Sequence, residues 1–393
     1  MPLTDLNIMY SGRKGPMLGL ALRTGLLTIL TLGFYRFWAK TRLRRYYWSA
    51  IRPGGIPLEY VGDPLEKLLG FLVAVVFMAF YIGVVNLILM YISFAWLQGN
   101  VAAYLLSLAG LAPIIFFAQY RARRYILART RWRGIRFGLE PGAWGYAWRA
   151  MVHWGLAIAT LGLAWPLTTL WLEKYKTNHT YFGNQQFVQG GRRGMLFGSM
   201  KHVYYPLVLS AVAGGMAAAF DNPAWLAAFL LTVPWGIYGL AYWRADSFKR
   251  LTEAKELGDM RFRTTPRPWT IIGIYALGWF LIYLVFTGLV LVATGLVLAA
   301  VGGGGGSFDL ENPDQIEAMM AAGAPIMILI YFAIFLSYRA MTHAWITLPI
   351  TAHFAEVTRI VNADDLHQIT QRDRDEFAEA EGFAEALDVG AAI

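Results

Sequence analysis

The sequence predicts an all-α polytopic membrane protein. Six transmembrane helices in three hairpins are expected, with two re-entrant or additional spanning segments and short cytoplasmic β strands after the basic helix ends. Three observations lead to this fold class. Of 393 residues, 57% are hydrophobic, which exceeds the usual share in a soluble domain. These residues form long uncharged runs, and Lys and Arg gather in four of the connections between the runs.

Six apolar runs are long enough to cross the hydrocarbon core of a bilayer as helices, at about 1.5 Å per residue. They lie at roughly 68–92, 101–119, 203–220, 224–243, 269–301 and 325–349. Two further runs, 17–37 and 151–172, are also long enough. Arg23 interrupts the first of these, and Gly162 and Pro166 interrupt the second.

The basic residues predict the orientation of the runs. Connections 39–67, 121–149, 173–202 and 244–268 contain six, eight, five and seven Lys and Arg, whereas 93–100, 220–224 and 302–324 contain none. The positive-inside rule places the four basic connections and the C-terminus in the cytoplasm. Because 17–37 and 151–172 have basic residues on both flanks, either they dip in and return or lie at the interface, or they break the rule locally.

The net charge of +9 is unevenly distributed. Residues 354–393 hold ten Asp and Glu against three Arg, so this tail carries −7 and the rest of the chain +16. On a membrane protein, a basic body indicates contact with anionic membrane lipids, and we expect no nucleic-acid partner. The acidic segment predicts a cytoplasmic tail with an amphipathic helix.

Nothing in the sequence identifies an enzyme. The chain has no cysteine, which excludes disulfides and thiolate metal sites, and its six His residues form no zinc-like spacing. Neither a P-loop nor a G-x-S-x-G motif is present. We therefore expect no catalytic residue, no metal and no cofactor.

A partial internal repeat predicts the domain organisation. Seven of the 17 residues from Arg42 to Leu58 match those from Arg121 to Phe137, and a second alignment starts with Thr-Leu-Gly at Thr31 and Thr160. The expected units are a first membrane repeat (1–145), a second repeat (146–267), a third, degenerate unit (268–353) and the acidic tail (354–393).

Each basic connection also contains a Gly followed by a β-prone segment. The four glycines are Gly55, Gly134, Gly183 and Gly258. Glycine allows a turn with positive φ, and the aromatic and aliphatic residues that follow it suit a pleated strand. The sequence therefore predicts a small cytoplasmic β element.

Four motifs together resemble the YjgN family of bacterial inner-membrane proteins, a group of unknown function. They are the Thr-Leu-Gly run, "RLRRYYW", "GGIPLEYVGDP" and the terminal "GFAEALDVGAAI". Phe37 stands where the family usually has Pro. The resemblance implies a multi-pass protein of the bacterial inner membrane and no assigned activity.

The repeated basic and aromatic clusters are the candidate lipid-headgroup sites. They consist of Arg42, Arg44, Arg45 and Tyr46, and of Arg121, Arg123, Arg124 and Tyr125. Guanidinium groups pair well with phosphate, but the same residues could act only as topology anchors. Arg23, Asn86 and His153 are candidate polar residues within the membrane. The expected function is transport or handling of a lipid or anionic amphiphile, and the alternative is a scaffold that recruits a protein partner at its cytoplasmic face.

Overall fold

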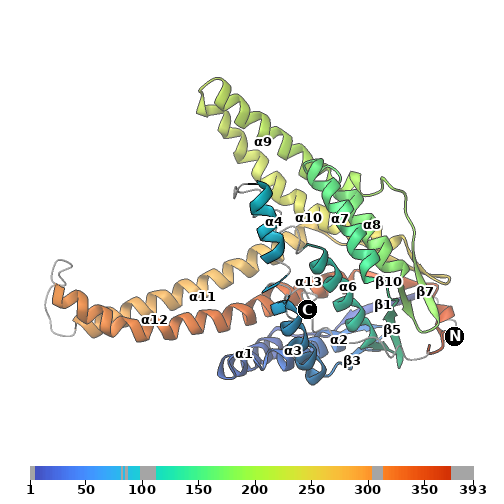
Figure 1. The fold of residues 1–393 in the computed structure, drawn as a ribbon, viewed down its shortest axis with the longest axis horizontal. Coiled ribbons are helices and arrows are strands. Elements are labelled where there is room, and N and C mark those ends of the chain that lie inside the picture. The colour runs from blue at the N-terminus through green and yellow to red at the C-terminus, as the bar shows by residue number, and fades with distance from the viewer. Residues whose placement is uncertain (1–4, 81–82, 85–86, 98–111, 303–312, 373–393) are drawn as a thin grey trace. The chain divides into compact units, whose positions relative to one another are not determined.

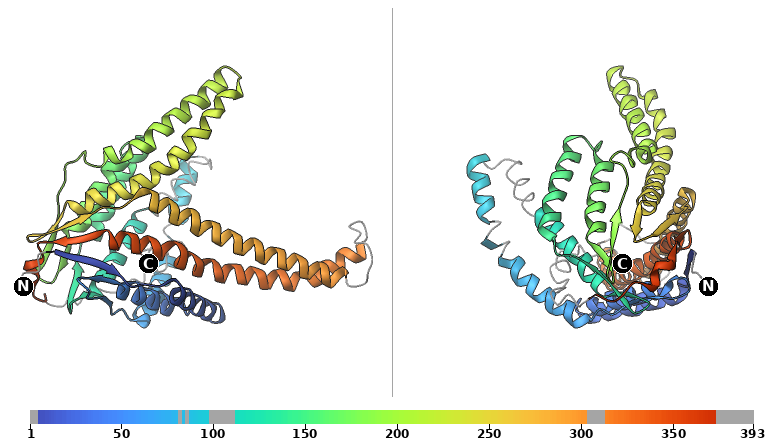
Figure 2. Two further views of the ribbon diagram at one scale, coloured as in Figure 1. Left: turned by 180° about the vertical axis from the view of Figure 1, so that it is seen from behind. Right: turned by 90° about the vertical axis from the view of Figure 1, so that its right-hand side faces the viewer.

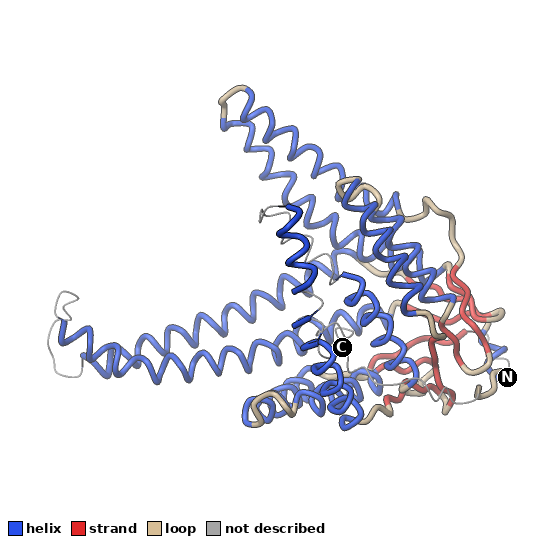
Figure 3. Tube along the Cα trace, viewed as in Figure 1, coloured by secondary structure: helices blue, strands red, loops and turns tan. Residues whose placement is uncertain are grey.

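The computed structural model describes residues 5–80, 83–84, 87–97, 112–302 and 313–372 (Figure 1). It divides into two compact units. The first comprises residues 1–11, 40–269 and 352–393, and the second comprises 12–39 and 270–351. The predicted all-α class is wrong, because the described residues of the first unit include a ten-stranded antiparallel sheet, drawn in red in Figure 3.

Four helices of the chain run directly into two short strands joined by a turn, and three of these strand pairs are β hairpins. The strand pairs follow α2 (Arg36–Ala50), α6 (Ala112–Ala128), α8 (Trp165–Asn178) and α10 (Phe229–Glu253). Their strands are β2 (Ile51–Pro53) with β3 (Leu58–Tyr60), β4 (Thr130–Trp132) with β5 (Ile135–Leu139), β6 (Thr180–Phe182) with β7 (Gln185–Gln189), and β8 (Lys255–Leu257) with β9 (Met260–Thr264). Strands do follow the four glycines, and each Gly has a positive φ between 55° and 83°. The strand before each Gly was not expected, because three residues are too few to establish a period of two.

The two ends of the described chain complete the sheet. Strands β1 (Asp5–Tyr10) and β10 (Thr358–Val361) pair with each other, with Leu6 opposite Ile360, and the full order is β2-β1-β10-β9-β8-β7-β6-β5-β4-β3. The edge strands β2 and β3 are not paired with each other, but only the turn at Gly54 and Gly55 separates them in the chain, so the sheet curls until its edges are neighbours. Side chains from distant strands accordingly share one core cluster, including Leu6, Trp132, Phe182 and Leu257.

A segment after β10 packs into this core. The 3₁₀ helix η5 (Ala363–His367) and the residues that follow it bury Ala363, Leu366 and Ile369 against the strands. Asn184 in the β6–β7 turn binds Thr370 through two hydrogen bonds, of 3.0 and 3.2 Å. Of the expected acidic tail, residues 358–372 therefore belong to the sheet region, and 373–393 lie outside the described residues.

Within the described residues, four helical segments are long and apolar enough to cross a membrane. They lie in Phe197–Ala219, Pro223–Glu253, Pro268–Val297 and Gly323–Glu356. They consist of η2 (Phe197–Met200), α9 (Lys201–Ala219), η3 (Pro223–Ala228), α10, most of α11 (Pro268–Gly302) and of α12 (Pro313–Thr342), the π-helical turn η4 (His343–Thr347) and α13 (Leu348–Glu356). Helices α9 and α10 run side by side in both views of Figure 2.

The expectation of six such helices is wrong. In the run at 68–92 the described residues form α3 (Pro64–Phe80) and α4 (Leu87–Leu97), of 17 and 11 residues, each shorter than the roughly 20 residues that a span needs. Residues 81–82 and 85–86 between them lie outside the described residues. Most of the run at 101–119 lies outside the described residues.

Neither ambiguous segment forms one continuous helix. Residues 151–172 are divided between α7 (Ala143–Ala159) and α8, which pack together: Thr168 donates a 2.9 Å hydrogen bond to the His153 carbonyl, and the Trp154 and Trp165 rings are 5.0 Å apart. The segment at 17–37 contains α1 (Lys14–Leu30), a turn, and the start of α2. Both turns occur at Thr-Leu-Gly.

Candidate functional site

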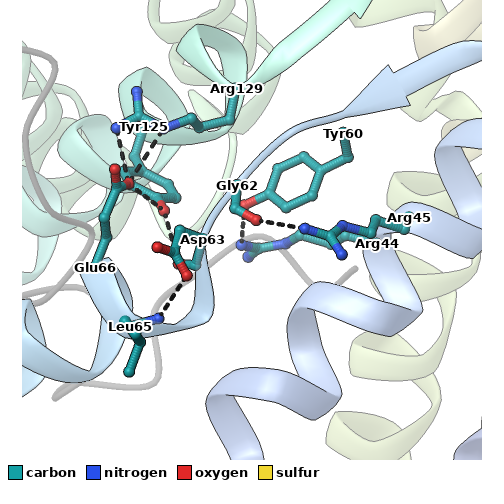
Figure 4. A network of polar contacts seen from close by, with 9 residues as sticks. All are labelled: Arg44, Arg45, Tyr60, Gly62, Asp63, Leu65, Glu66, Tyr125 and Arg129. Carbon is teal, nitrogen blue, oxygen red and sulfur yellow. Dashed lines mark hydrogen bonds and ion pairs between the residues drawn. The ribbon is translucent and has the colours of Figure 1, made fainter.

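Helices α2 and α6 carry the repeated basic clusters, and both lie against the segment that leads from β3 into α3 (Figure 4). Asp63 and Pro64 start α3 there. The Asp63 carboxylate accepts a 3.0 Å hydrogen bond from the Leu65 N–H, and Pro suits the first helical position. We call the site the Arg–Tyr corner. Its residues are Arg44, Arg45, Tyr60, Asp63, Glu66, Lys67, Tyr125 and Arg129.

Two cations in this corner are almost fully buried. Arg44 is 1% exposed and Lys67 is 0% exposed. Both lie against the ring of Tyr60, with the Arg44 Cζ 5.8 Å and the Lys67 Nζ 5.2 Å from its centroid. Lys67 also lies 5.8 Å from the centroid of the Tyr125 ring. Aromatic faces stabilise cations that are removed from water, so the two tyrosines favour positive charge at this position.

A carboxylate lies beside these cations. One oxygen of Glu66 accepts hydrogen bonds from Arg129, at 2.8 and 3.2 Å, and from the Tyr125 hydroxyl at 3.2 Å. Burial opposes the charge of Arg129, but its bond to Glu66 outweighs this and raises the pKa of the guanidinium. Four cations and two carboxylates leave the corner with a net positive charge.

The basic corner adjoins an apolar surface. Beyond Lys67, the outward side chains of α3 include Leu69, Leu72, Val73 and Val76, which are 46% to 71% exposed. The corner therefore places net positive charge at the start of an exposed hydrocarbon face. An anionic amphiphile is complementary to this surface, because its negative headgroup matches the basic corner and its hydrocarbon chain matches the apolar face.

The profile of one protein family, described as "Bacterial protein of unknown function (DUF898)", matches residues 5–385. The chain belongs to the DUF898 family. This confirms the resemblance to YjgN proteins that the sequence motifs indicated. No curated protein and no solved structure is significantly similar to the chain.

In this DUF898 chain the two predicted basic clusters are not equivalent. Arg44, Arg45 and Tyr125 come together at the corner, where Arg45 donates a 3.1 Å hydrogen bond to the Gly62 carbonyl. Arg124 instead donates to the Leu139 carbonyl at 3.1 Å and braces the end of β5. Of the other members, Arg42 is exposed, Tyr46 packs on Tyr47, and Arg121 lies over Phe117.

Arg123 belongs to a second charged cluster, which sequence reasoning missed. Glu173 in α8 forms ion pairs with Lys176 at 2.9 Å and with Lys255 in β8 at 2.8 Å. Burial would raise the pKa of Glu173, but Lys255, Lys176 and Arg123 together hold that pKa well below its usual range. The cluster fastens α8 to the neighbouring hairpin of the sheet.

The three polar residues predicted to lie within the membrane do not form a shared site. Arg23 is exposed on α1 in the second unit. His153 lies between α7 and α8 in the first unit and stacks on Trp171 at a centroid distance of 6.1 Å. Asn86 lies outside the described residues. Where the chain is described, no group of three or more His, Asp or Glu side chains is placed to hold a metal ion.

Five residues of the corner were missed by the sequence analysis: Tyr60, Asp63, Glu66, Lys67 and Arg129. The sequence did contain evidence for two of these residues. Glu66 and Lys67 are neighbours of opposite charge directly before a long apolar run, and charged residues at such positions are often functional.

Proposed function

We propose that the chain is a multi-pass protein of the bacterial inner membrane that binds an anionic lipid or amphiphile at the Arg–Tyr corner and handles or transports it. Four long apolar helices support the membrane location. Exposed leucines such as Leu209, Leu231 and Leu291 support it further, because water would disfavour so much uncovered hydrocarbon.

The sheet supports one orientation for all the basic connections. Each connection contributes two consecutive strands to the sheet. Strand β3 pairs with β4, β5 with β6, and β7 with β8, so strands from consecutive connections are hydrogen-bonded to each other. The strands have only three to six residues, whereas a strand that crosses a bilayer core needs about 9 to 11, so this sheet does not extend across the membrane. All four connections therefore lie on one side, and the positive-inside rule makes that side cytoplasmic, together with β10 near the C-terminus.

The observation that carries the ligand proposal is the net positive corner at the start of the exposed apolar face of α3. A phosphate or carboxylate headgroup would be attracted to the corner while its acyl chain follows Leu69, Leu72 and Val76. Arg45 is the exposed cation of the corner, and one of its five N–H donors is directed at the Gly62 carbonyl. We assign Arg45 the direct contact, while the buried Arg44 and Lys67 supply the local field.

The test compares two exposed arginines. Arg45→Gln removes a corner charge, whereas Arg52→Gln removes the same charge from β2, away from α3. A basic residue near anionic lipid contributes about 1 kcal/mol, so R45Q is expected to retain roughly fivefold less anionic lipid in native mass spectra of gently extracted protein. R52Q should retain the wild-type amount. Equal loss in both variants, or loss in neither, would contradict a specific site at the corner.

A further inference from the structure

We infer that the Thr-Leu-Gly turns at 31–33 and 160–162 are lipid-inserted wedges, through which Leu32 and Leu161 enter the boundary between headgroups and acyl chains. The inference rests on the membrane location proposed above. It assigns an interaction surface to two turns that the Arg–Tyr corner does not use.

The two leucines combine backbone strain with nearly complete exposure. Their φ angles are 51° and 50°, in the left-handed region that bulky residues avoid. Their side chains are 92% and 91% exposed. A turn facing water would be more stable with Gly or Asn at this position, since those residues tolerate the conformation and leave no hydrocarbon in water. A strained, exposed Leu in both turns is favourable where its side chain meets lipid.

Both turns satisfy their backbone groups internally, as insertion into lipid requires. The Gly162 N–H donates to the Ala157 carbonyl at 2.7 Å, and the Gly33 N–H donates to the Thr28 carbonyl at 2.7 Å. The hydroxyl of Thr160 accepts from the Ala164 N–H at 3.0 Å, and that of Thr31 accepts from the Tyr35 N–H at 2.9 Å. The same bonds close both turns.

The surface around Leu161 is apolar. No Asp, Glu, Lys or Arg occurs from residue 150 to residue 172, and Ile158 and Leu163 beside the turn are 73% and 58% exposed. Arg149, just before this stretch, points back toward the start of α7, where its guanidinium donates to the Gly145 carbonyl at 3.0 Å. The charged end of Arg149 is thus directed away from the turn, as is typical of basic side chains that extend from an apolar layer toward water.

The contact with α9 sets the depth of insertion. The hydroxyl of Tyr204, one turn into α9, donates to the carbonyls of Gly162 and Leu163 at 3.0 and 3.2 Å. The turn therefore lies where the apolar run of α9 begins, rather than at its middle. Leu161 is placed at the acyl boundary, the depth at which interfacial elements insert. In the second unit, Gly25 of α1 lies against Leu336 of α12, so the helix that leads into the Leu32 turn packs on a long apolar helix.

The sheet requires both segments to return to their starting side. β5 and β6 pair directly, with Phe137 opposite Phe182, so the chain between them crosses the bilayer an even number of times. β1 and β2 also pair, which sets the same condition on residues 11–50. A shallow helical wedge fulfils this condition, whereas a single span would not.

Site-directed spin labelling can test the wedge, because the chain has no cysteine of its own. We would label L161C and L32C in full-length protein reconstituted into phosphatidylethanolamine–phosphatidylglycerol vesicles, and measure collision with oxygen and with a water-soluble nickel chelate. S49C, on an exposed position of α2, is the aqueous reference. L231C is the mid-bilayer reference, since the neighbouring Thr232 pairs with Ser210 midway along α9.

The wedge predicts that both turn labels prefer oxygen over nickel, with L161C between the values of L231C and S49C. Nickel access equal to that of S49C would overturn it. Shielding from both reagents would also overturn it, because a protein surface would then cover the turn. If L231C itself reacts as an aqueous site, the membrane location fails, and the wedge fails with it.

Discussion

Glu173 joins helix α8 to strand β8 through a buried ion pair with Lys255. Its side chain is 17% exposed, and Lys176 binds the second carboxylate oxygen. Removing one partner of such a pair leaves uncompensated buried charge, which commonly costs about 3 kcal/mol or more. The stability of the α8–sheet junction therefore depends on this carboxylate being ionised.

Glu173→Gln should reduce the free energy of unfolding of the detergent-solubilised protein by about 3 kcal/mol and should therefore clearly lower its unfolding temperature. Glu140→Gln is the matched control, because its 3.9 Å pair with Arg372 is largely exposed and should contribute at most about 1 kcal/mol. The pKa of Glu173 is lowered in the folded state. Its contribution is therefore complete above the ordinary carboxyl pKa of about 4.3 and is lost as the pH falls below it. The wild type and E173Q should converge in acid, and a constant difference down to pH 3 would contradict the ion-pair explanation.

Residue patterns predicted part of the site. Arg44, Arg45 and Tyr125 were identified because their order recurs along the chain. Lys67 and Tyr60 were not, since their burial arises from the packing of α2 and α6 on the 60–67 segment, and a local pattern does not record it. Glu173 and Lys255 are 82 residues apart, so their pairing also depends on the tertiary fold.

Among the elements, the β6–β7 turn holds the segment that follows η5. A Cβ on Gly183 would lie 2.3 Å from the Thr370 carbonyl oxygen and 2.7 Å from Ile369. Gly134 forms the corresponding turn between β4 and β5, and its Cβ would meet nothing within 4 Å. Both glycines have a positive φ, so the two positions differ mainly in this close approach.

Gly134→Ala should cost about 1 kcal/mol from backbone strain alone. Gly183→Ala should reduce the free energy of unfolding distinctly more, because it must also displace residues 369 and 370 from the core of the sheet. Thermal unfolding in detergent measures the destabilisation of both variants, and proteolysis after residue 372 reports release of the segment that follows η5. Equal destabilisation in the two variants would argue against tight packing at Thr370.

The elements themselves were only partly predictable. Glycine and β-prone residues correctly placed β3, β5, β7 and β9. Strands β1 and β10 escaped prediction because they pair with each other across almost the whole chain. The all-α class failed for the same reason, since a sheet assembled from hairpins far apart in sequence leaves a weak local signal.

At the scale of the molecule, the order of the sheet and the distribution of charge support the same proposed topology. The strands bring the four basic connections together in one sheet, and charge counting predicted from the sequence that these four connections share one side of the membrane. The helical hairpin at 151–172 required the structure, because length and hydropathy alone do not distinguish it from a span.

The central claim is that the sheet lies in the cytoplasm while the α9–α10 turn lies outside. Single-cysteine labelling with a membrane-impermeant maleimide tests it most directly, using Ala224→Cys in the exposed turn and Ser49→Cys on α2. In intact bacterial cells stripped of their outer membrane, A224C should react at once, and S49C should react only after the inner membrane is permeabilised. Reaction of S49C in intact cells, or equal reaction at both positions, would contradict the account.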